Sequence, residues 1–230
     1  MEHSLRIHIP HTKKYINGVF RGNSTMPILI FVHGLTGNMN EHQFFNAARW
    51  FEKKGIATFR FNLYDDWMPR TRKLNECTLQ THARDIDLVT KFLQKHSSNK
   101  IHIAGHSYGG PSILLSHHPL FQSAILWDPT AVPIFQKLSP IIKNQIGKRM
   151  IEEDKTLNAP LLLDSFSVPT KIICAGKSSL KNSWRQAWKK YDYKQHAFCT
   201  IPGASHCFDE DGAEEKLFLE TYQWIQKHKK

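Results

Sequence analysis

Short apolar runs alternate along this chain with segments whose apolar residues recur every three or four positions. Runs of the first kind are typical of strands, and spacing of the second kind gives a helix one apolar face. The pattern predicts strands over residues 5–9, 15–20, 27–32, 56–61, 101–104, 123–127, 170–175 and 197–201. It predicts helices over residues 41–54, 79–96, 108–116, 183–191 and 209–227. Strands that alternate with helices in this way indicate an α/β fold, with a mostly parallel sheet and helices on both faces.

The stretch from residue 130 to residue 169 differs from the rest because it shows no strand pattern. Pro133, Pro140 and Pro160 interrupt it, and residues 134–151 are compatible with one or two short helices. No internal repeat, low-complexity segment or linker divides the chain. We therefore expect a single domain over residues 1–230.

Composition narrows the class of protein. The hydrophobic share is 40%, the mean hydropathy is −0.44, and no run approaches the ~18 apolar residues of a membrane span. Residues 1–10 are too polar for a secretory signal. The four cysteines have no zinc-site spacing, and we expect reduced thiols at Cys77, Cys174, Cys199 and Cys207. We expect a cytoplasmic protein.

The net charge of +11 raises the question of an anionic partner. The lysines and arginines are spread along the chain, and no nucleic-acid-binding module accompanies them. We interpret them as a solvated basic surface and expect no specific nucleic acid partner. The adjacent pair Asp65 and Asp66 does not by itself form a metal site, so we expect neither a metal nor an organic cofactor.

The sequence from Gly105 to Gly109 has the pattern Gly-x-Ser-x-Gly and directly follows a predicted strand. A serine at such a sharp strand-to-helix turn is pushed out of the sheet edge with its hydroxyl exposed. Glycines flank it because a Cβ atom would collide with the adjoining strand or helix. The pattern indicates that Ser107 is a nucleophile.

A serine hydroxyl needs a base to remove its proton, and histidine is the natural base near pH 7. Of the 14 histidines, His206 lies in the loop between the last predicted strand and the last helix, where the fold should place the base. Ser107, Asp128, His206 and His33 each follow a predicted strand, and the carboxyl ends of parallel strands share one edge. We interpret three further histidines as packing or surface residues: His82, His102 and His106.

A developing oxyanion needs donors, usually two backbone N–H groups. Tyr108, the residue after the nucleophile, offers one, and Leu35, in the loop after the third predicted strand, offers the other. We interpret His33 as a structural residue of that loop, bordering the place where substrate binds.

Three segments together resemble the α/β-hydrolase superfamily: residues 33–38 (HGLTGN), 105–110 (GHSYGG) and 203–208 (GASHCF). Within it, the first of these and residues 55–61 are similar to small cinnamoyl or feruloyl esterases. The resemblance covers nearly the whole chain. It implies an eight-stranded sheet, a Ser–acid–His triad, and a helical cap between strands six and seven, which would be residues 130–169.

The chain departs from that family pattern at two places. Residues 62–67 replace the usual acidic residue and small Gly-His-Gly turn, so this loop is remodelled. The family usually places the triad acid shortly after strand seven, but residues 176–181 contain no carboxylate. Asp128 after strand six is the leading alternative, Asp164 and Asp192 are weaker ones, and an absent acid is the last.

We expect a serine hydrolase that acts on a carboxylic ester or a similar small acyl substrate. An apolar acyl pocket is expected from residues of the remodelled loop and the cap: Trp67, Met68, Ile134, Phe135 and Leu138. Two alternatives stay open, a hydrolase-like scaffold that binds a ligand or partner without catalysis, and an acyltransferase.

Overall fold

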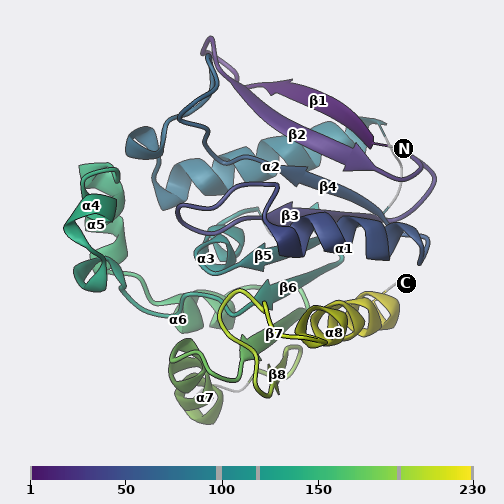
Figure 1. Cartoon of the computed structure of the whole chain (residues 1–230), viewed down its shortest axis with the longest axis vertical. Coiled ribbons are helices and arrows are strands. Elements are labelled where there is room, and N and C mark those ends of the chain that lie inside the picture. Colours follow the sequence, from purple (N-terminus) through teal and green to yellow (C-terminus); the bar gives the residue numbers. More distant parts are fainter. Residues whose placement is uncertain (1, 97–99, 118–119, 191–192, 229–230) are drawn as a thin grey trace.

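Eight strands form one sheet in a computed structural model that describes residues 2–96, 100–117, 120–190 and 193–228. The strands are β1 (Glu2–His8), β2 (Tyr15–Arg21), β3 (Ile28–Val32), β4 (Ala57–Phe61), β5 (Ile101–His106), β6 (Ser123–Trp127), β7 (Thr170–Ala175) and β8 (Ala197–Ile201). Their order in the sheet is β1-β2-β4-β3-β5-β6-β7-β8 (Figure 1). The pairs β1/β2 and β2/β4 are antiparallel and the others are parallel, which confirms the predicted fold class.

The chain reverses its direction of travel across the sheet at β3. It passes from β3 outward to β4 and then returns to place β5 on the other side of β3. In open α/β sheets, ligands bind at the carboxyl ends of the strands where this reversal occurs. The loops after β3 and β5 are therefore neighbours at the edge where the sequence places Leu35 and Ser107.

Helices cover both faces of the sheet. On one face, α1 (His42–Glu52) and α8 (Ala213–Lys227) pack on side chains such as Phe31 and Trp127. On the other face, α2 (Leu79–His96), α3 (Gly109–Leu114) and α7 (Leu180–Lys190) pack on the alternate residues, such as Ile30. All five residues of β3 are buried, as expected for a strand covered on both sides. Over the described residues, no helix combines the length and apolar content that a membrane crossing requires.

Between β6 and β7 the chain forms short helices that Figure 1 shows at the side away from the two termini. They are the 3-10 turn at 135–137, α4 (Pro140–Lys143), α5 (Lys148–Lys155) and α6 (Ala159–Asp164). The sequence pattern did not predict α6, because Pro160 reads as a helix breaker. Here it stands in the first turn, where proline is well tolerated, and the Asn158 side chain accepts a hydrogen bond from Leu161 N.

Candidate active site

Ser107 occupies a strained turn between β5 and α3. Its φ is 54°, in the left-handed region that side chains other than glycine rarely adopt. The Ser107 N–H donates to Trp127 O at 3.0 Å, which fixes the turn against β6. A Cβ at Gly109 would lie 2.5 Å from Val32 O, so β3 and the start of α3 can meet only at a glycine. The turn therefore holds the hydroxyl at the carboxyl edge of the sheet.

His206 and Asp128 meet at this edge from different loops. His206 Nδ1 lies 2.6 Å from Asp128 Oδ2, and Asp128 is fully buried. The other carboxyl oxygen, Oδ1, accepts a hydrogen bond from Ala175 N at 3.0 Å. Because a carboxylate only accepts, His206 Nδ1 donates, and the lone pair is left on Nε2. The pair has the geometry that holds an imidazole in one tautomer.

The described structure places Asp164, one of the two other carboxylates considered for this role, in a different part of the fold from His206. Asp164 ends α6, and its charge acts on His196, where it favours the protonated form against the burial that lowers the pKa of that histidine to about 4. Asp192 lies outside the described residues. Of the alternatives that the sequence left open, Asp128 is the carboxylate that the described structure brings to the His206 ring.

Ser107 and His206 line a common cavity of about 400 Å³. Its wall is built by the loops after β6, β7 and β8 and consists of Thr130, Ile134, Lys177, Ser178, Ser179, Leu180 and Ser205. The segment after β7, which lacks the acid of the family pattern, thus contributes hydroxyl groups to the cavity. Among the described residues, no three histidine, cysteine or carboxylate side chains gather as a metal ion would require.

His106, the residue before Ser107, contacts His206 directly. Its Nε2 lies 2.9 Å from the His206 backbone O, and the two rings are 4.6 Å apart at 40°. A carbonyl only accepts, so His106 Nε2 carries the proton. Burial, and then the charge of His206, lower the pKa of His106 to about 3, so the ring stays neutral. The sequence interpretation of His106 as a packing residue missed this contact, although a polar residue in an otherwise apolar strand beside the nucleophile was a signal.

The loop after β3 approaches the nucleophile closely. A Cβ at Gly34 would lie 2.9 Å from Ser107 Cβ, so glycine is required there. Within the described ranges, the backbone N–H groups of Leu35 and Tyr108 donate to no backbone carbonyl oxygen. His33 is buried, its Nδ1 donates to Gly34 O at 2.8 Å, and its Nε2 accepts from Leu63 N at 3.0 Å. Burial lowers the pKa of His33 to about 4, so it serves as a neutral brace between this loop and the loop after β4.

The expected acyl-pocket residues are mostly dispersed. Ile134 lines the cavity of Ser107. Phe135 is buried and lines a separate cavity with residues of α5, and Trp67 is 95% exposed beside a third cavity. Met68 is half exposed, and neither it nor Leu138 lines the cavity of Ser107. The structure therefore does not bring Trp67, Met68 and Phe135 together at the nucleophile.

Glu41, the residue before α1, has a half-buried carboxyl group packed against the loop after β3. A Cβ at Gly37 would lie 2.6 Å from Glu41 Oε1, and Oε2 is buried without a hydrogen-bond partner in the described structure. Burial raises the pKa of Glu41 to about 7, against the opposing charges of His42 and His206. Between about pH 4.5 and pH 7, folded Glu41 therefore keeps a proton that the unfolded chain releases.

We expect Glu41→Gln to become progressively more stabilising, relative to the wild type, as pH rises from about 4.5 to 7. Unfolding of the wild type over this window releases the proton that folded Glu41 keeps, so its free energy of unfolding falls as pH rises, whereas glutamine does not titrate. Urea unfolding of both proteins at about pH 5 and pH 8 measures the difference, with Glu215→Gln, an exposed site, as control. An equal difference at both pH values contradicts the expectation.

Solved structures similar to this chain support the fold. Est1E from Butyrivibrio proteoclasticus has 18% sequence identity, covers 98% of each chain, and has a TM-score of 0.78. A dienelactone hydrolase from Anabaena variabilis has 17% identity over 100% of this chain and 99% of its own, with a TM-score of 0.74. The α/β hydrolase GrgF from a Penicillium species has 12% identity with the same coverage and a TM-score of 0.83. No protein-family model and no curated protein sequence matches the chain. The chain has the α/β-hydrolase fold.

Proposed function

We propose that this protein is a serine hydrolase that cleaves a carboxylic ester or a similar small acyl substrate through an acyl-enzyme. The observation that carries the proposal is the 2.6 Å contact between His206 Nδ1 and Asp128 Oδ2. It orients a histidine whose free nitrogen can face the cavity that His206 shares with Ser107. The names of the similar structures, Est1E bound to ferulic acid and a dienelactone hydrolase, agree with acyl chemistry on this fold.

In the proposed first step, Ser107 Oγ attacks the substrate carbonyl carbon while His206 Nε2 takes the hydroxyl proton. The carbonyl oxygen becomes an oxyanion, which the N–H groups of Leu35 and Tyr108 would hold. Return of the proton from His206 to the alcohol oxygen breaks the ester bond and leaves the acyl group on Ser107. Water, activated by the same nitrogen, then releases the acid.

Asp128 would stabilise the imidazolium that forms in both steps. It is fully buried, and its two oxygens accept from Ala175 N and His206 Nδ1, so its orientation is set before substrate arrives. A preorganised carboxylate in a site of low dielectric constant interacts with a developing charge more strongly than one in water. We expect Ser107 Oγ and His206 Nε2 to hydrogen-bond when substrate closes the cavity, as catalytic pairs often do only in the complex.

The decisive experiment combines burst kinetics on p-nitrophenyl acetate with mass spectrometry of the rapidly quenched protein. The proposal expects a burst of one p-nitrophenol per active site and an acetyl group on Ser107. If added alcohols or amines take the acyl group in preference to water, the protein is an acyltransferase. Folded protein that neither reacts nor becomes acetylated is a scaffold without catalysis, and the proposal fails.

His106→Phe is expected to lower kcat by about tenfold to 100-fold with little change in KM. Phenylalanine keeps a ring against His206 but removes the hydrogen bond to the His206 carbonyl. A small misplacement of a catalytic group lowers the rate by up to about 100-fold. His106→Gln places an amide N–H near the same carbonyl and is expected to recover most of the rate. Steady-state kinetics on the three proteins test this. Equal kcat in all three, or equal losses in both variants, would exclude the positioning role.

A further inference from the structure

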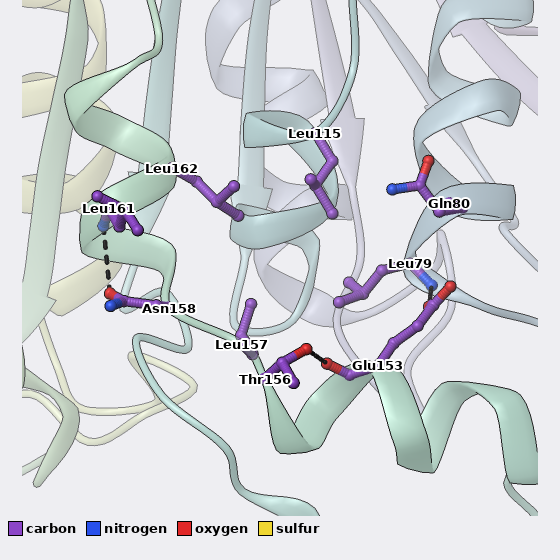
Figure 2. A pocket seen from close by; sticks show the side chains of 9 residues that line it. All are labelled: Leu79, Gln80, Leu115, Glu153, Thr156, Leu157, Asn158, Leu161 and Leu162. Carbon is purple, nitrogen blue, oxygen red and sulfur yellow. Dashed lines mark hydrogen bonds between the residues drawn. The ribbon is translucent and has the colours of Figure 1, made fainter.

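A cavity of about 240 Å³ lies at the seam between the short helices of the insertion and the body of the fold. Figure 2 shows Leu79, Leu115, Leu157 and Leu162 extending toward a common centre, with Gln80 and Glu153 on one side. The leucines come from α2, the residue that follows α3, the segment that joins α5 to α6, and α6 itself. None of these residues lines the cavity of Ser107, so the seam is a separate site.

The apolar seam cavity continues into a polar one. A second cavity, of about 530 Å³, also has Gln80 and Glu153 in its wall, so the two adjoin along these residues. Its wall carries three exposed cations: Arg84, Lys148 and Arg149. In the part of the chain that the structure describes, no carboxylate forms an ion pair with any of the three.

The two carboxylates of the polar cavity are engaged elsewhere. Glu153 Oε2 accepts a hydrogen bond from Leu79 N at 2.5 Å, at the start of α2. Glu76 pairs with Lys14, outside the cavity, and also accepts from Lys73 N at 2.8 Å. Both carboxyl groups thus bond to partners other than the three cations, and the cavity wall has three cationic side chains against two carboxylates.

The start of α5 adds to this positive field. The helix begins at Lys148, its N-cap is Gly147, no side chain caps it, and its first turn contains no acidic residue. A helix N-terminus carries a partial positive charge, so two basic residues in the first turn are unfavourable there unless an anion is near. Arg84 faces the same cavity from α2 and increases the repulsion.

We propose that the seam binds a single-chain amphiphile with a carboxylate head, such as a medium-chain fatty acid. The alkyl chain would occupy the leucine-lined cavity, where burial removes its apolar surface from water. The carboxylate would lie in the adjoining cavity among Arg84, Lys148 and Arg149. An apolar cavity that opens into a cationic one matches a molecule with one apolar end and one anionic end. A short anion has no apolar end, and an uncharged alcohol has no anionic end.

Titration calorimetry with decanoate, kept below its micelle concentration, tests the proposal. We expect saturable binding with one site per chain, a negative heat-capacity change from burial of the alkyl chain, and lower affinity as salt is raised. Acetate lacks the chain and 1-decanol lacks the charge, so both should bind at least about tenfold more weakly. Absence of saturable decanoate binding, or equal affinity for 1-decanol, would overturn the proposal.

Two variants locate the site. Lys148→Gln/Arg149→Gln should weaken decanoate binding about tenfold, because it removes two cations near the head group. The control Lys53→Gln/Lys189→Gln lowers the net charge equally at exposed positions away from the seam and should leave affinity unchanged. Leu162→Gln, at a partly exposed wall position, should weaken binding through the chain. Unchanged affinity in both seam variants would place the ligand elsewhere, for example at Ser107, and overturn the proposal.

A second copy of the chain is the competing occupant of the seam. Light scattering during gel filtration measures the molar mass, and so distinguishes a dimer from a monomer that binds the ligand. A monomer whose mass does not change on adding decanoate supports the ligand site. A dimer that dissociates in Leu162→Gln would show that the seam is an interface between copies, and the proposal would then fail. Both readouts are independent of hydrolysis, so they remain informative if the proposed activity of Ser107 is not found.

Discussion

Replacing Asp128 with asparagine is expected to lower kcat about 10⁴-fold while the protein stays folded. The reason lies in the contact between Asp128 Oδ2 and His206 Nδ1. Asparagine can turn its NH₂ group toward Nδ1, which then must accept, so the proton moves to Nε2. His206 can no longer accept the Ser107 proton, and the imidazolium loses its counter-charge. Steady-state hydrolysis of a chromogenic ester measures the loss.

Two matched variants make the result for Asp128 specific. Asp164→Asn and Asp192→Asn remove the carboxylates that the sequence offered as alternatives, and each should keep kcat within about threefold. Thermal unfolding of all three variants separates loss of catalysis from loss of fold. If Asp128→Asn keeps full turnover, or if Asp164→Asn or Asp192→Asn shows the larger loss, the assignment of the acid is wrong.

Replacing Ser107 with alanine is expected to remove turnover to the level left by oxyanion stabilisation and binding, a fall of about 10⁶-fold. Among the described residues of this cavity, Ser107 is the hydroxyl-bearing residue that lies at the strained turn after β5, where its φ is 54°. Alanine at that φ keeps the strain, so we expect a fold of nearly unchanged stability. The measurements are hydrolysis rate and melting temperature.

Ser179→Ala is the matched control, because Ser179 is a serine of the same cavity. It should keep kcat within about threefold, since its hydroxyl has no catalytic role in the proposed steps. Substantial hydrolysis by Ser107→Ala would show that another group is the nucleophile. An equal collapse of both serine variants would show that the cavity, and not this hydroxyl, is what the reaction requires.

The sequence predicts the sheet and its reactive edge well because both depend on local patterns. A strand buried on both faces, such as β3, is a continuous apolar run, and its neighbours are separated by helices of the right period. Parallel strands place their carboxyl ends together, so the loops containing Ser107, Asp128 and His206 had to lie at one edge. The glycines around Ser107 follow from the same geometry, because β3 and α3 leave no room for a Cβ at Gly109.

The sequence could not decide which carboxylate lies beside His206. That contact joins residues 78 positions apart across the ends of β6 and β8, and it depends on the backbone of Asp128, whose φ is 39°. No local pattern encodes such a turn. The resemblance pointed to strand seven instead, where the structure has the hydroxyl groups of Ser178 and Ser179.

The positions of the expected acyl-pocket residues could not be predicted from the sequence for a related reason. Trp67 and Met68 lie in an irregular loop, where neither a strand nor a helix period tells which way a side chain points. In the structure, Asp65 and Lys73 hold this loop, and Trp67 is displayed to solvent. Phe135 packs on Tyr108 with ring centroids 5.1 Å apart, inside the core and away from the cavity of Ser107.

In the proposed mechanism, Ser107 is a nucleophile made reactive by His206 and Asp128. Labelling with a fluorophosphonate, followed by peptide mapping, tests this most directly, because the reagent reacts rapidly with an activated serine and far more slowly with an ordinary hydroxyl group. We predict one label per chain, located on Ser107, that is absent in Ser107→Ala and forms far more slowly in Asp128→Asn. Well-folded protein that takes up no label, or that takes it up at another residue, would contradict the claim.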